Sequence, residues 1–279
     1  MKRIDQAREK LRHADALLIT AGAGMGVDSG LPDFRGTEGF WRAYPVIKKL
    51  GYRFEEMANP RWFEEDPTLA WAFYGHRLQL YRDTIPHAGF TKLLQYAQSK
   101  KGGYFIFTSN VDGQFQKAGY DSRNIVEIHG SIHHLQCTLP CSRTIRSAAD
   151  VHLQIDPERF RTVSPLPECP DCGRIMRPNI LMFGDWNWIA DRTDAQSMAL
   201  QRWLDERQER AERIVVLEFG AGKAVPTVRI FSEQIAQRYE ASLIRVNPRD
   251  DDVPPGAIGI AEGALTAIEQ LLEGVQHAG

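Results

Sequence analysis

Several features that define whole classes of protein are missing from this sequence of 279 residues. Lys and Arg number 34 against 36 Asp and Glu, which gives a net charge of −2 and no basic excess for binding nucleic acid. No apolar run approaches the ~20 residues of a membrane-spanning helix. The segment Met1–Gln6 is followed by no apolar stretch typical of a signal peptide. We therefore expect a cytoplasmic protein that binds neither nucleic acid nor membrane, with its oligomeric state left open.

Cysteine is scarce as well, because the chain contains only four. So few cysteines in a chain of this length do not form a disulfide scaffold. They fall into two close pairs, Cys137 with Cys141 and Cys169 with Cys172. Two such pairs on tight turns can converge on a tetrahedral zinc ion with Zn–S distances of ~2.3 Å, and four thiolates close the site, so this zinc would be structural. Four free, buried cysteines are the alternative.

What the chain does contain is a loop rich in glycine after its first apolar run. The run Ala16–Thr20 leads into Gly22, Gly24 and Gly26. Glycine lets backbone N–H groups approach a phosphate closely, and a strand followed by such a loop and a helix N-terminus is a typical anion site. An ordinary tight turn between strand and helix is the alternative.

Three more apolar, β-branched runs end in small or polar residues, and helical patterns separate them. The four runs are Ala16–Thr20, Tyr104–Phe107, Ile214–Leu217 and Ser242–Val246. Such runs are typical of buried parallel strands, which predicts an α/β fold with a Rossmann-like parallel sheet. Ligands bind beyond the carboxyl ends of strands in this kind of sheet, so we expect the polar strand ends to lie together there.

The remaining segments predict helices and two insertions. Helices are expected over Ile4–His13, Phe90–Ser99, Ala195–Arg213, Val225–Tyr239 and Ala264–Leu272. The segment Phe40–Arg82 is predicted to be helical, and residues 137–178 form an inserted, loop-rich module. We predict a Rossmann-like domain made of residues 1–36, 88–133 and 181–279. A small domain would combine the helical insertion 37–87 with the zinc module 134–180.

Polar residues at two further places suit a binding site. Ser109, Asn110 and Asp112 follow the second apolar run, and His129 precedes Gly130. The Asn and Asp side chains can bond a carboxamide or a ribose, or they can cap a helix. The histidine is either structural or catalytic.

In their order along the chain these motifs resemble the sirtuin family, across roughly residues 14–250. The matching segments are Gly22–Gly24, Ser29–Gly36, Thr108–Asp112, Ala118–Gly119, Ile128–Ser131, the two cysteine pairs and Arg177–Asp185. The resemblance implies an NAD-dependent enzyme that removes acyl groups from lysine in proteins or peptides. Its products would be nicotinamide and O-acyl-ADP-ribose.

The resemblance also implies roles for individual residues. His129 would be the general base, since an imidazole of near-neutral pKa can deprotonate a ribose hydroxyl. Asp112 would contact the carboxamide of nicotinamide. Phe183 and Gly184 would line the acyl-lysine channel, with core packing as the alternative. The residues expected to contact NAD are Gly22, Ala23, Gly24, Asp33, Phe34, Arg35, Ser109, Asn110, Asp112, Gly220, Ala221 and Asn247.

The pair Tyr74 and Arg77 indicates which kind of acyl group is removed. Their i, i+3 spacing places them on one helix face, and the desuccinylase and demalonylase branch of the family carries a Tyr-x-x-Arg pair at this position. A phenol and a guanidinium can hold a carboxylate, which predicts succinyl or malonyl groups as substrates. A surface arginine beside a core tyrosine is the alternative.

The chain departs from the family at four places. Gly26 replaces Ser, Ser109 replaces Gln, Gln114–Phe115 replaces Leu-His, and Gly220–Gly222 replaces Gly-Thr-Ser. Each lost hydrogen bond costs ~1 kcal/mol, which predicts weaker NAD binding or a different pose. Two alternative functions follow: ADP-ribosyl transfer or NAD hydrolysis, and a catalytically weak sensor of NAD or ADP-ribose.

Overall fold

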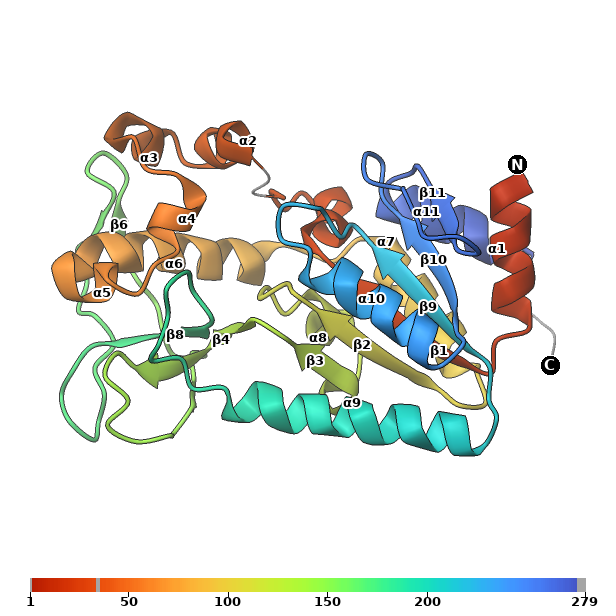
Figure 1. The fold of residues 1–279 in the computed structure, drawn as a ribbon. Coiled ribbons are helices and arrows are strands. Elements are labelled where there is room, and N and C mark those ends of the chain that lie inside the picture. Colours follow the sequence, from red (N-terminus) through yellow and green to blue (C-terminus); the bar gives the residue numbers. More distant parts are fainter. Residues whose placement is uncertain (1, 34–35, 275–279) are drawn as a thin grey trace.

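A computed structural model describes residues 2–33 and 36–274, and a six-stranded sheet forms its centre (Figure 1). The strands are β1 (Ala16–Ala21), β2 (Tyr104–Thr108), β3 (Ile125–Glu127), β9 (Ile214–Phe219), β10 (Ser242–Val246) and β11 (Ile258–Ile260). They lie in the order β11-β10-β9-β1-β2-β3, and every neighbouring pair is parallel. The loops that follow the strands therefore meet at one edge of the sheet, as predicted.

Helices cover both faces of this sheet. Along β1, Leu17 and Ile19 face one apolar layer, whereas Ala16 and Leu18 face the other, because side chains alternate along a strand. The first layer holds helices α1 (Lys2–Arg12), α7 (Ala88–Gln98) and α11 (Ala264–Leu272). The second layer holds α9 (Asp191–Glu209) and α10 (Thr227–Arg238). This arrangement is the predicted Rossmann-like α/β fold.

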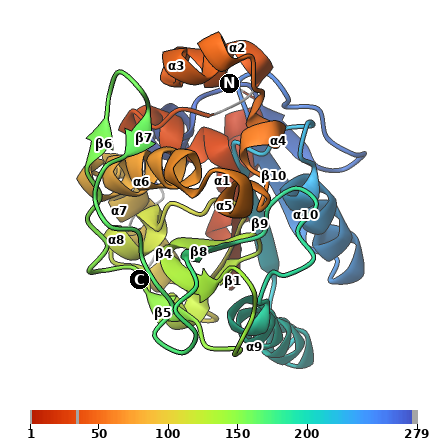
Figure 2. The same ribbon diagram turned by 90° about the vertical axis from the view of Figure 1, so that its left-hand side faces the viewer.

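A second apolar cluster forms where five helices pack against short antiparallel strands (Figure 2). The helices are α2 (Gly36–Ala43), α3 (Pro45–Leu50), α4 (Phe54–Met57), α5 (Trp62–Glu65) and α6 (Pro67–Asp83). The strands are β4 (Gly130–Cys137), β5 (Arg146–Ser147), β8 (Met176–Ile180), β6 (Ile155–Asp156) and β7 (Arg161–Thr162). Short elements elsewhere are η1 (Ala23–Ser29), α8 (Gln114–Lys117) and η2 (Ser122–Asn124).

Helix α6 organises this second cluster. It begins at Pro67, and an oxygen of Asp66 accepts a hydrogen bond from the Leu69 N–H at 3.0 Å, which caps the helix. The buried Trp71 donates from its indole to the carbonyl of Met176 at 2.9 Å, so the helix is fastened to β8. A long buried helix therefore joins the aromatic segment to the strands of the cysteine module.

The predicted elements differ from the structure mainly at their ends. All four predicted strands are present, but β3 and β11 were not predicted because each has only three residues. Helix α9 begins at Asp191 rather than Ala195, since Asp191 and Asp194 suit the positive end of the helix dipole. Residues 137–178 were predicted to be rich in loops, but they contain antiparallel pairs formed by β5, β6, β7 and parts of β4 and β8. Among the described residues, no helix is long and apolar enough to cross a membrane.

Candidate functional site

Two glycine loops pack backbone against backbone where β1 and β9 end. The N–H of Gly22 donates to the carbonyl of Phe219 at 2.9 Å, and that of Gly24 donates to Gly220 at 3.1 Å. A Cβ atom on Gly24 would lie 2.6 Å from the Cα of Gly220. A Cβ atom on Gly22 would lie 2.8 Å from the carbonyl oxygen of Gly220. Gly220 itself has a φ of 60°. These glycines are therefore needed for the contact between the loops, with Ala23 beginning η1 beside them.

The end of β2 is tied to the first of these loops. The Ser109 N–H donates to the carbonyl of Ala21 at 3.1 Å, and the side-chain amide of Asn110 donates to the carbonyl of Gly22 at 3.0 Å. The N–H of Asn110 is held by the Thr108 hydroxyl at 3.0 Å. The fold thus brings Ser109 and Asn110 to the glycine loop, although they are far from it in the sequence.

Asp112 and His129 are titratable groups next to these strand ends. An oxygen of Asp112 accepts from the N–H of Gln114 at 2.9 Å, so this carboxylate caps the start of α8. Burial raises the pKa of Asp112 to about 6, the bond to Gln114 opposes that shift, and Glu127 adds to it. Burial lowers the pKa of His129, and a hydrogen bond to the backbone of Ser109 opposes the shift. The His129 imidazole is therefore neutral at pH 7 and able to accept a proton.

Ala221 and Asn247 meet where β9 and β10 end. The Asn247 side chain donates to the carbonyl of Ala221 at 2.8 Å, and its oxygen accepts from the N–H groups of Arg249 and Asp250 at 3.0 Å each. Asn247 is fully buried, so its side chain organises the backbone of both loops. The Arg249 guanidinium reaches Asp33 of the first loop at 2.8 Å. An exposed ion pair therefore links two segments that are distant in the sequence.

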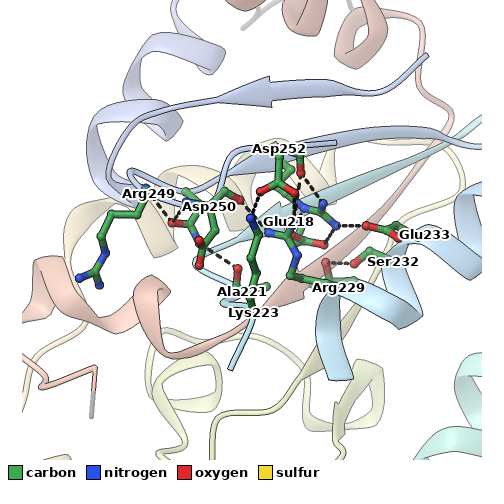
Figure 3. Close-up of polar contacts among 12 residues, drawn as sticks. Glu218, Ala221, Lys223, Arg229, Ser232, Glu233, Arg249, Asp250 and Asp252 are labelled. Atoms are coloured by element: carbon green, nitrogen blue, oxygen red, sulfur yellow. Dashed lines mark hydrogen bonds and ion pairs between the residues drawn. The ribbon is translucent and has the colours of Figure 1, made fainter. Parts of the chain in front are cut away.

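A buried network of charges lies beside these loops and was not predicted. Arg245 on β10 pairs with Glu218 on β9 at 2.5 Å, and both side chains are at most 1% exposed. Arg245 also pairs with Glu233 of α10 at 2.8 Å and donates to the carbonyl of Asp252 at 2.7 Å. Figure 3 shows Arg229 of α10 reaching the same Asp252. Two charged residues inside otherwise apolar strands are the sequence signal that could have revealed this network.

Tyr74 and Arg77 lie together inside the aromatic cluster around α6. They are 1% and 6% exposed, so the alternative of a surface arginine is wrong. The Arg77 guanidinium lies 5.8 Å from the centroid of the Tyr74 ring and donates to the Tyr81 hydroxyl at 2.9 Å. Burial raises the pKa of Tyr74 to about 12, so its hydroxyl keeps its proton. That hydroxyl is buried and has no hydrogen-bond partner within the part of the chain that the structure describes.

The turn that carries Phe183 and Gly184 is held by a buried ion pair. Asp185 accepts two hydrogen bonds from Arg177, at 2.7 and 2.8 Å, and both side chains are at most 1% exposed. The N–H of Met182 donates to the same carboxylate at 3.3 Å. Phe183 is 42% exposed, so simple core packing does not describe its place. The ion pair therefore fixes a turn that presents an aromatic side chain to the surface.

Phe54 connects this turn to the buried arginine. Its ring centroid lies 6.3 Å from that of Phe183, at an interplanar angle of 90°. The Arg77 guanidinium lies 5.7 Å from the centroid of the same Phe54 ring. The predicted acyl-lysine channel and the predicted carboxylate clamp are thus separated by a single aromatic side chain.

The four cysteines lie together near the end of β4, where Cys137 is the last residue of that strand. The sulfur atoms of Cys137 and Cys172 lie 3.6 Å apart, as do those of Cys141 and Cys169, and all four lie within 4.8 Å of one another. These distances are too long for disulfide bonds, which measure ~2.05 Å. They match the edges, ~3.8 Å, of a tetrahedron with Zn–S bonds of ~2.3 Å. The cluster could therefore hold the predicted zinc ion, and it offers no open position for catalysis.

Two of the departures from the family pattern have a packing reason. Phe115 is 2% exposed and packs against Phe90 with ring centroids 5.1 Å apart, so it fills the apolar core. A Cβ atom on Gly26 would lie 3.0 Å from the side chain of Leu31, which leaves little room for a larger residue. Two predicted NAD contacts, Phe34 and Arg35, lie outside the described residues.

Comparison with protein families and curated proteins gives consistent results. The model of the Sir2 family matches residues 22–202. A protein of Thermus thermophilus named NAD-dependent protein deacylase is 30% identical over 278 residues, covering 98% of this chain and 95% of the relative. NAD-dependent protein deacylase 1 of Archaeoglobus fulgidus is 28% identical over 94% of each chain.

Solved structures of similar fold are Sir2 proteins as well. A complex of a Sir2 homologue with ADP-ribose has a TM-score of 0.71 and 24% identity, covering 98% of this chain and 96% of the other. A Sir2 protein bound to an acetylated peptide has a TM-score of 0.67 and 20% identity, covering 97% and 98%. At these identities the likeness shows the fold.

Proposed function

This chain belongs to the Sir2 family, and we propose that it is an NAD-dependent protein-lysine deacylase that favours acyl groups ending in a carboxylate, such as succinyl or malonyl. The relatives named above support the NAD-dependent deacylase activity. The structural neighbour with an acetylated peptide supports acyl-lysine as the substrate class. The preference for an acidic acyl group rests on side chains of this chain.

The strand ends fit a dinucleotide. Four loops converge there, and two of them are built from glycines that lack room for a Cβ atom. When bound, NAD supplies the ribose carbon to which the acyl oxygen is transferred as nicotinamide leaves. Asn110 and Asp112 would hold the nicotinamide side, and Asn247 would shape the adenosine side. The neutral imidazole of His129 would take the proton from a ribose hydroxyl.

The unpartnered hydroxyl of Tyr74 carries the proposal for the acyl group. It is a buried donor beside the cationic Arg77, and one aromatic ring separates that arginine from Phe183. An acetyl group ends in a methyl and offers neither side chain a partner. A succinyl or malonyl group ends in a carboxylate, which can accept from the phenol and pair with the guanidinium. The site thus gains two interactions from the acidic acyl groups alone.

The test compares kcat/KM for succinyl-, malonyl- and acetyl-lysine peptides of one sequence, with nicotinamide and O-acyl-ADP-ribose followed by mass spectrometry. A hydrogen bond to a charged group contributes about 1.5–3 kcal/mol, so Arg77→Met should lower the succinyl-to-acetyl ratio about 10- to 150-fold. Tyr74→Phe keeps the ring and should lower the same ratio about 10-fold. Arg210→Met removes an equal charge from the exposed end of α9 and should leave the ratio at its native value.

Three outcomes contradict parts of the proposal. If acetyl-lysine is the better substrate and Arg77→Met does not change the ratio, the acidic acyl preference is wrong. If His129→Ala keeps native turnover, the imidazole is not the base. If nicotinamide appears at the same rate without any acyl-lysine peptide, the deacylase activity is wrong. That last result would favour ADP-ribosyl transfer or NAD hydrolysis, whereas NAD binding without turnover would favour a sensor.

A further inference from the structure

A cavity of about 590 Å³ opens between the C-terminal end of α6, α8, β4 and the first turns of α9. Its lining includes neither glycine loop, nor His129, nor the turn at Phe183. Of the residues predicted for the candidate site, it reaches Asp112 alone. Ser131, His133 and His134 of β4 line it, whereas Ile132 belongs to the apolar cluster, and the pairing of β4 with β8 is irregular between Ser131 and Leu135.

Two cations in the cavity wall have no carboxylate partner among residues 2–33 and 36–274. Arg82 donates to the backbone carbonyls of Ala148 and Val151, at 2.6 Å each. Lys117 donates to the backbone carbonyls of Arg82 and Thr84, at 2.5 and 2.6 Å. These bonds orient both side chains without neutralising their charge. The wall therefore carries two cations, one of them on the exposed Lys117, that form no ion pair within the described residues.

Two buried nitrogen atoms of lining residues have no hydrogen-bond partner in the described part of the chain. They are Nδ1 of His134 and Nη1 of Arg192, whose other terminal nitrogen pairs with Glu127. Burial, together with the nearby Arg192 and His133, lowers the pKa of His134 to about 4. A ligand with acceptor oxygens would give a partner to Arg192 Nη1 and, in the tautomer that carries the proton on Nδ1, to His134 as well. The acidic lining residue, Asp112, has its pKa raised to about 6, so it is mostly ionised at pH 7 and offsets part of the charge of Arg82 and Lys117.

We propose that this cavity binds a small phosphate monoester of sugar or nucleoside size. A phosphate group brings about two negative charges and three strong acceptor oxygens, which suits two cations without an ion pair and two buried nitrogen atoms without a hydrogen-bond partner. The volume lies within the ~300–1,000 Å³ range of small-molecule sites and exceeds the needs of phosphate alone. Gln116, Ser122 and Gln196 line the rest of the cavity and can bond hydroxyl groups. This inference goes beyond the proposed deacylase function and does not depend on it.

The experiment measures binding of ribose 5-phosphate to the full chain by isothermal titration calorimetry, without NAD or peptide. Inorganic phosphate and ribose are the reference probes, and both should bind more weakly than ribose 5-phosphate. Lys117→Met and His134→Leu should each weaken binding of ribose 5-phosphate at least 10-fold. Arg202→Met removes an equal charge from the exposed face of α9 and should bind as the native chain does.

A second measurement uses the native chain alone, so it does not depend on whether a variant folds. In the native chain, ribose 5-phosphate should shift the imidazole resonances of His133 and His134 in NMR spectra. The proposal is overturned if ribose 5-phosphate does not bind, if these resonances stay in place, or if both folded variants bind as tightly as the native chain. Equal affinity for inorganic phosphate would overturn the assignment of a sugar or nucleoside part. Because no turnover is measured, failure of the deacylase proposal leaves this test unaffected.

Discussion

Replacing Glu218 with glutamine should expose how much the buried charge network contributes to the fold. Glu218 and Arg245 occupy paired positions of β9 and β10, and the guanidinium donates to both carboxylate oxygens, at 2.5 and 3.1 Å. Both side chains are at most 1% exposed. Glu218→Gln keeps the shape and removes the charge, so it leaves the guanidinium buried with one partner fewer.

The expected cost follows from the burial of the pair. Two unit charges ~4 Å apart interact by about 4 kcal/mol at an effective dielectric constant of ~20. Breaking a buried pair from one side typically costs about 3–5 kcal/mol. Glu233 still pairs with Arg245 and is 42% exposed, so it compensates part of the loss. We therefore expect the free energy of unfolding to fall by about 3 kcal/mol, at the lower end of that range.

The assay is urea unfolding followed by far-UV circular dichroism. The midpoint should fall while the slope stays constant, because the surface exposed on unfolding does not change. Glu9→Gln is the matched control, since it removes the same charge from a pair with Arg12 on the surface of α1. That change should leave the midpoint nearly unchanged, because exposed pairs contribute little.

A double variant separates the charge pair from the packing. Glu218→Leu combined with Arg245→Leu removes both charges and should cost less than Glu218→Gln, because no buried charge is left unpaired. If Glu218→Gln costs no more than Glu9→Gln, the argument from burial is wrong. If the double variant costs more than the single one, the pair contributes net stability that its desolvation does not offset.

Two further predictions concern pH and metal. The pKa of Asp112 is raised from 3.8 to about 6, so the folded chain binds more protons than the unfolded chain between these values, and stability falls as pH rises through this window. One pKa unit corresponds to about 1.36 kcal/mol, so Asp112→Asn should be up to roughly 3 kcal/mol more stable than the native chain at pH 8. At pH 4 the two should be equally stable, and urea unfolding at both pH values measures the difference. A difference that is the same at both pH values would contradict this prediction. The purified protein should contain one zinc ion per chain by elemental analysis, and its removal by a chelator, or Cys172→Ser, should lower the melting temperature. A melting temperature that does not respond to the chelator would show that the cluster is not a structural metal site.

Some parts of the fold and the site follow from local sequence. Continuous apolar runs predicted the four longer strands of the parallel sheet, because a strand buried on both faces is apolar at most positions. Polar residues after those runs predicted where a ligand binds. The three-residue strands β3 and β11 carry no such run, and they form because a neighbouring strand offers a parallel edge. The predicted domain boundaries stay a prediction.

Other properties depend on groups that are distant in the chain. Spacing placed Tyr74 and Arg77 on one helix face, but only the packing of α6 shows that the arginine is buried among aromatic rings. Likewise, the sequence marks Gly22 as part of a glycine-rich loop, whereas the contact with Gly220 shows why a Cβ atom is excluded.

The sequence by itself determined the family, the parallel sheet, the two cysteine pairs and the kinds of residue at the site. These depend on spacing along the chain, which local backbone geometry converts directly into strands, helices and turns. Only the tertiary structure decided which side chains are buried, which polar atoms lack partners and which charged groups pair with one another. Desolvation and electrostatic energy depend on neighbours from every part of the chain, so the Glu218–Arg245 pair and the cavity at His134 become visible only after folding.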